Sequence, residues 1–225
     1  MPASTLLRLS GLALLLAFAL VIAGGLLHPQ SERLVDIAGS ATTASHGIFA
    51  LAFALVLVGL PGLYAALADR AGVLGLIGFV LMMMFSAYHV YMLLYEAGPV
   101  AAMADDQAAG RLFAPGGVVQ QGTLRAWLGP IGIVAPLVFG AAIMRSGARP
   151  HWAGWAVIAF VPAFFAAAAV GSALQVETRE SLFDLWFTPI SLALTYGLLL
   201  LGLAAPGYQL WRSQTLSFDP PLPAP

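Results

Sequence analysis

Six apolar stretches follow one another along this 225-residue chain, and each is about as long as a membrane-spanning helix. A helix needs ~20 mostly apolar residues to cross ~30 Å of hydrocarbon. The sequence does not alternate apolar and polar residues as the strands of a β-barrel do. Helices are then the structure that satisfies every backbone hydrogen bond inside lipid. The sequence therefore predicts an all-α polytopic membrane protein, a bundle of six transmembrane helices. The predicted spans cover residues 6–27, 47–68, 72–95, 127–144, 152–174 and 183–204.

Composition supports the same class of protein. Hydrophobic residues make up 60% of the chain and charged residues only 8%. A water-soluble domain has about 25% charged residues, and it cannot hide this much apolar surface. The net charge of −1 gives the chain no positive electrostatic field that would attract a nucleic acid. The expected partners are the lipid bilayer and either a small amphipathic ligand or a partner membrane protein.

The residue types that are missing limit the chemistry. The chain has no Cys and no Lys, which excludes disulfides, thiolate sites and Schiff bases. No zinc-protease, nucleotide-loop or nucleophile-elbow motif is present. A haem held by two histidines needs them at one depth, and no other span has a His level with His89. The sequence therefore predicts no cofactor, no metal and no catalytic residue.

Arginine placement predicts the orientation. Arg70, Arg145 and Arg149 lie in very short loops, where positive charge favours the inner side of a membrane. Both chain ends are therefore expected inside. Residues 1–216 form one transmembrane domain, and the Pro-rich tail 217–225 is expected to be disordered. The first span is expected to be a retained signal anchor, with a cleaved signal peptide as the alternative.

Polar residues inside the spans are the candidates for function, because an ionisable group in lipid is costly. His89 lies roughly 9 Å below the outer end of the third span. Helical spacing puts it on one face with Ser86 and Glu96. The sixth span has a polar stripe, and His46 opens the second. We expect an outward-facing polar pocket among the second, third and sixth spans. Its ligand-binding candidates are His89, Ser86, Glu96, His46, Asp184, Thr188, Ser191 and Thr195. In the alternative interpretation, His89 only joins two helices by a hydrogen bond.

Prolines inside the spans indicate where helices bend, because each removes an internal hydrogen bond. Pro61, within Gly59-Leu60-Pro61-Gly62, is the strongest candidate for a hinge, and Pro189 in the sixth span is the second.

Several short motifs resemble those of a group of uncharacterised six-helix membrane proteins from GC-rich bacteria. They are Gly59-Leu60-Pro61-Gly62-Leu63-Tyr64, Ala71-Gly72, Leu74-Gly75-Leu76-Ile77-Gly78-Phe79-Val80, Glu96-Ala97 and Pro150-His151-Trp152-Ala153-Gly154. The group usually has Arg in place of His151. The resemblance spans residues 45–175. It implies the fold and a bacterial cytoplasmic membrane, and it brings no known activity.

Three functions fit these observations. The favoured hypothesis is a non-enzymatic binding, sensing or accessory role through the outward-facing pocket. The second is a membrane-embedded redox or metal-dependent enzyme subunit that uses His89. The third is a small transporter of an apolar or amphipathic molecule, bending at Pro61 and Pro189.

Overall fold

The computed structural model describes residues 2–29, 39–100, 122–174 and 189–217, and the prediction of an all-α protein is confirmed. The sixth span is predicted at 183–204, and the helix in this region continues beyond that end to Ser213. The described elements are α1 Ala3–Leu27, α3 Ser40–Tyr95, the π-helical turn η1 Glu96–Val100, α6 Gly122–Ser146, α7 Trp152–Leu174 and α8 Pro189–Ser213.

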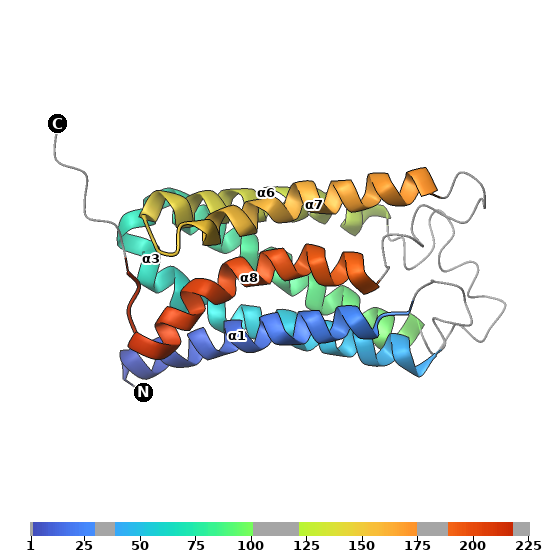
Figure 1. Ribbon diagram of the computed structural model, residues 1–225, viewed down its shortest axis with the longest axis horizontal. Helices are drawn as coiled ribbons and strands as arrows, with labels where there is room; N and C mark the ends of the chain where they lie inside the picture. Colours follow the sequence, from blue (N-terminus) through green and yellow to red (C-terminus); the bar gives the residue numbers. More distant parts are fainter. Residues whose placement is uncertain (1, 30–38, 101–121, 175–188, 218–225) are drawn as a thin grey trace.

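The longest element, α3, contains a sharp reversal. Gly72 has φ 58° and ψ −145°, and it is the one residue inside α3 with non-helical angles. A residue with a Cβ avoids this region, so glycine is the residue that fits the turn. The chain crosses the bundle before Gly72 and returns after it (Figure 1). We call residues 40–71 the first arm and residues 73–95 the second arm of α3.

The two predicted hinge residues have different positions in this fold. Pro61 lies in the first arm, where the backbone keeps helical angles. Pro189 is the first residue of α8. A proline fits at the start of a helix because its missing N–H has no partner there in any case. A hinge role for either residue stays a prediction, and the reversal of α3 takes place at Gly72.

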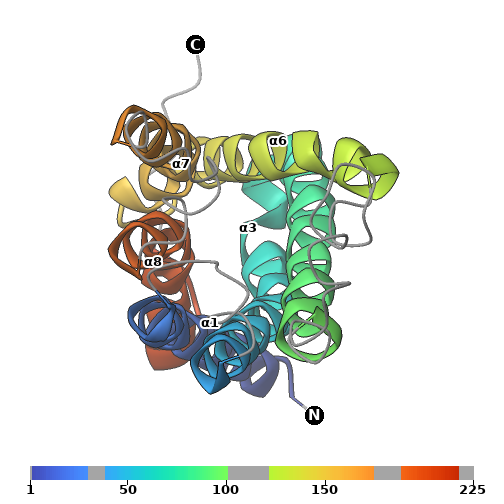
Figure 2. The same cartoon turned by 90° about the vertical axis from the view of Figure 1, so that its right-hand side faces the viewer.

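The helices form a closed ring in the order α1, α3, α6, α7, α8 (Figure 2). The first arm of α3 packs against α1, where Leu14 contacts Gly59. The second arm packs against α6, where Phe139 contacts Gly78. One apolar core joins all five helices. Its largest fully buried side chains include Phe53, Phe139, Leu14, Leu60, Met82, Leu199 and Leu203.

Glycines bring the helix backbones close together. A Cβ on Gly140 would lie 2.7 Å from the carbonyl oxygen of Gly154, and one on Gly11 would overlap the carbonyl oxygen of Gly207. Close approach through small residues is the usual way in which membrane helices pack, because lipid provides no hydrophobic force between them.

Large apolar side chains cover the outside of the ring. Val73 is 74% exposed and Ile190 is 68% exposed. Four helices in the described part of the chain are long and apolar enough to cross a membrane: Ala3–Leu27, Ser40–Gly98, Gly129–Ser146 and Ile190–Ser213. Trp152–Ala167 is a shorter apolar helix. Such a surface suits contact with a lipid bilayer.

The start of α1 and the end of α8 lie at the same end of the bundle (Figure 1). There the Gln209 amide donates to the Arg149 carbonyl oxygen at 2.7 Å and accepts from the Ser217 backbone N–H at 2.8 Å. The Arg149 N–H in turn donates to the Ser217 carbonyl oxygen at 2.8 Å. The predicted tail therefore begins with a residue that is tied to the bundle, and residues 218–225 lie outside the described residues.

Candidate functional site

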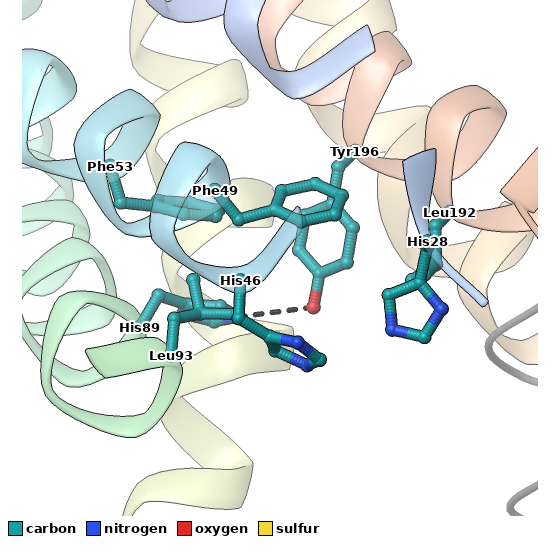
Figure 3. Close-up of a pocket in the computed structure, with 8 residues that line it drawn as sticks. All are labelled: His28, His46, Phe49, Phe53, His89, Leu93, Leu192 and Tyr196. Carbon is teal, nitrogen blue, oxygen red and sulfur yellow. Dashed lines mark hydrogen bonds between the residues drawn. The ribbon is translucent and has the colours of Figure 1, made fainter. Parts of the chain in front are cut away.

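A cluster of histidine and aromatic side chains lies in the half of the bundle away from the start of α1 and the end of α8. His28 directly follows the last residue of α1, and His46 lies six residues after the start of α3. His89 is in the second arm, and Tyr196 is in the second turn of α8. The reversal at Gly72 places the start and the end of α3 at the same end of the bundle. Four helical segments therefore bring these side chains together (Figure 3).

Hydrogen bonds fix both ring nitrogens of His89. Nδ1 lies 2.8 Å from the carbonyl oxygen of Phe85, and Nε2 lies 3.1 Å from the hydroxyl of Tyr196. Because a carbonyl oxygen only accepts, Nδ1 has the proton, and Nε2 accepts from the Tyr196 hydroxyl. The ring also stacks on Phe53, with centroids 4.5 Å apart. These contacts define one tautomer and one orientation for an imidazole inside the bundle.

His46 is held in the same way on the first arm. Its Nδ1 donates to the carbonyl oxygen of Thr42 at 2.9 Å, and its Nε2 lies 3.3 Å from Oε2 of Glu96. With the Nδ1 proton already donated, the contact between Nε2 and the carboxylate needs a second proton between them. That proton is bound either to Nε2 or to the carboxylate, and the contact lets it pass from one to the other. His28 lies beside His46, with ring centroids 5.0 Å apart.

Two cavities meet at the hydrogen bond between His89 and Tyr196. The smaller one has a volume of about 40 Å³ and is lined by His28, His46, Phe49, Phe53, His89, Leu93, Leu192 and Tyr196. The larger one has a volume of about 370 Å³. Its lining is formed by Met84, Phe85, Tyr88, His89, Gly129, Ile131, Gly132, Ile133, Phe160, Val161, Phe164, Phe165 and Tyr196. We call these the small cavity and the aromatic cavity. His89 and Tyr196 line both.

The structure brings three of the predicted residues together at this site. His89 lines both cavities, His46 lines the small cavity, and Glu96 contacts His46. Ser86 is fully buried on the second arm of α3, and its hydroxyl has no hydrogen-bond partner among the described residues.

Two residues of the predicted polar stripe of the sixth span are described by the structure. Ser191 and Thr195 are on α8, and neither is among the residues that line the two cavities. Asp184 and Thr188 lie outside the described residues.

Sequence reasoning missed Tyr196, the side chain from α8 that His89 contacts. The signal was present, because a tyrosine inside an apolar helix has a hydroxyl that needs a partner. The predicted first span ends at residue 27, directly before His28. In the structure its side chain is 3% exposed and lines the small cavity. The aromatic lining was not predicted, because a Phe in an apolar span looks the same whether it faces lipid or a cavity.

No metal site is present within the described ranges, where no three His, Asp or Glu side chains are placed to hold an ion. A scan against protein-family models, a search of curated proteins and a search of solved structures each found no match. The resemblance to six-helix bacterial membrane proteins therefore stays an expectation, and a function has to be proposed from the site itself.

Proposed function

We propose that this chain is a binding protein of the bacterial cytoplasmic membrane that holds a small amphipathic molecule with an aromatic ring in the aromatic cavity. It crosses the membrane six times, with each arm of α3 making one crossing and both chain ends inside. In this orientation the site lies in the outer half of the bilayer. The role is non-enzymatic.

The observation that supports this proposal is the aromatic cavity with one polar edge. A volume of about 370 Å³ is within the range of small-molecule sites. Phe85, Phe160, Phe164 and Phe165 offer ring faces and edges to a flat ligand. The bonded pair of His89 and Tyr196 supplies the few placed polar groups that orient a ligand in an apolar site.

Direct binding to the purified protein in detergent tests the proposal. The probes are 4-nitrophenol, which has an aromatic ring and one hydroxyl, and nitrobenzene, which lacks the hydroxyl. We expect both to bind, with 4-nitrophenol favoured about fivefold, the equivalent of one hydrogen bond of ~1 kcal/mol. In the double variant His89→Leu with Tyr196→Phe this preference should disappear while nitrobenzene still binds.

A cavity-filling variant separates this site from general partitioning into detergent. Gly132 lines the aromatic cavity, and a Cβ there would lie 3.8 Å from Phe85, an ordinary contact. Gly132→Phe should therefore fill the cavity and abolish binding of both probes. Val134→Phe is the matched control, because Val134 is on the same helix, is 42% exposed and does not line the cavity. Equal binding by the two variants would refute the site.

A further inference from the structure

The two histidines on α3 are held in the same chemical arrangement. Each donates its Nδ1 proton to the carbonyl oxygen four residues earlier, at 2.9 Å for His46 and 2.8 Å for His89. Nε2 is therefore the atom at which each ring exchanges a proton. These two nitrogens contact Glu96 and Tyr196, respectively. Both histidines also line the small cavity.

The small cavity has the size and lining of a water site. A water needs at least ~10–15 Å³ of such volume and two to four polar partners. The volume of about 40 Å³ meets the first need, and the buried Nε2 of His28 with the Tyr196 hydroxyl meets the second. The ionisable groups around both cavities are His28 from α1, His46, Tyr88 and His89 from α3, Glu96 from η1, and Tyr196 from α8. The residues of α6 and α7 that line the aromatic cavity have no ionisable side chain.

We propose that Glu96, His46, the small cavity, His89 and Tyr196 form a proton path between the end of the bundle and a ligand in the aromatic cavity. This inference rests on the proposed function and names its ligand class, an aromatic molecule with an ionisable hydroxyl. Glu96, whose side chain is 27% exposed, is the outer end of the path. His89 and Tyr196 are the inner end, because they line both cavities.

Each step of the path is a proton transfer. The ligand O–H breaks and its proton goes to the Tyr196 oxygen, while the Tyr196 proton goes to Nε2 of His89. The ligand is then an anion beside an imidazolium. His89 releases the proton from the same Nε2 to water in the small cavity. The proton between His46 and Glu96 leaves to solvent from the carboxylate, and Nε2 of His46 takes the proton from the water. No electron moves, and the reverse steps protonate the ligand.

A pH jump with bound 4-nitrophenol tests the path, because the colour of this probe reports its protonation state. After rapid mixing to a new pH, the colour of the bound probe should change quickly in the wild-type protein. In His46→Gln and Glu96→Gln the change should be about 100-fold slower, the lower end of what one placed proton-transfer group contributes. The affinity for 4-nitrophenol should stay the same. His151→Gln and Asp69→Asn are matched controls at exposed positions away from both cavities, and they should keep the wild-type rate.

A second variant tests the water cavity without removing an ionisable group. Leu93 lines the small cavity and not the aromatic one. Leu93→Phe should exclude the water and slow the colour change to a similar degree, which keeps the test open if the other variants do not fold. A wild-type rate in all three variants that still bind the probe would overturn the path and leave the proposed function intact. Failure of the wild-type protein to bind either probe would overturn the proposed function itself.

Discussion

At the scale of single residues, the hydrogen bond between His89 and Tyr196 joins α3 to α8 inside the bundle. Hydrogen bonds between membrane helices contribute ~0.6 kcal/mol on average and at most ~1.7 kcal/mol. A double-mutant cycle with His89→Leu and Tyr196→Phe should give a coupling energy of that size in reversible unfolding in detergent micelles. Tyr64→Phe is the control, because Tyr64 stacks on Phe79 and should be additive with His89→Leu. A coupling of zero would contradict the bond.

The same residues show what the sequence could predict of the site. The cost of an ionisable group in lipid identified His89, and helical spacing placed it near Glu96. The polar stripe predicted on the sixth span includes Ser191 and Thr195, and the side chain of α8 that contacts His89 is Tyr196. The rotation of α8 decides between these neighbours, and contacts such as Gly25 against Ala193 set that rotation. A hydropathy pattern does not contain this information, because it does not record which backbones come into close contact.

At the scale of elements, the predicted break between the second and third spans is achieved by one glycine. Gly72 has φ 58° and ψ −145°, and a Cβ there has open space around it. Gly72→Ala should therefore destabilise the protein through backbone strain alone, by about 1–3 kcal/mol. Gly47→Ala is the matched control, because Gly47 is helical and also has open space. It should be neutral or stabilising by up to ~1 kcal/mol. Thermal unfolding in detergent measures both, and equal effects would refute the strain.

Helix contacts give the second prediction at this scale. A Cβ on Gly11 would overlap the Gly207 carbonyl oxygen, and it would lie 2.6 Å from the Trp211 backbone nitrogen. Backbone atoms cannot rotate away, so Gly11→Ala should force α1 and α8 apart at a cost of about 1–3 kcal/mol. The measurement is again unfolding in detergent, with Gly47→Ala as the reference. Wild-type stability in Gly11→Ala would show that the two helices do not pack so closely.

At the scale of the whole molecule, the cluster of histidine and tyrosine side chains lies in one half of an apolar bundle. The closed ring packs small residues between neighbouring helices and exposes large apolar side chains outside. This cluster lies away from the start of α1 and the end of α8, because the reversal at Gly72 returns α3 to the end from which it started. A path confined to one half suits exchange of a ligand and its proton with one side of the membrane.

Which side this is follows from the orientation, and the chain is well suited to a test because it has no Cys. Single cysteines at Pro29 and Ala97 mark the end of the bundle with the site, and cysteines at Asp69 and Ser213 mark the opposite end. Arg70, Arg145 and Arg149 in short loops predict that the end with Asp69 and Ser213 is inside.

In bacterial cells with a permeable outer envelope, a membrane-impermeant maleimide should label Pro29→Cys and Ala97→Cys directly. Asp69→Cys and Ser213→Cys should be labelled only after the membrane is opened. The reversed pattern would place the site on the cytoplasmic side, and labelling of Asp69→Cys together with Ala97→Cys in intact cells would show that the second arm of α3 does not cross.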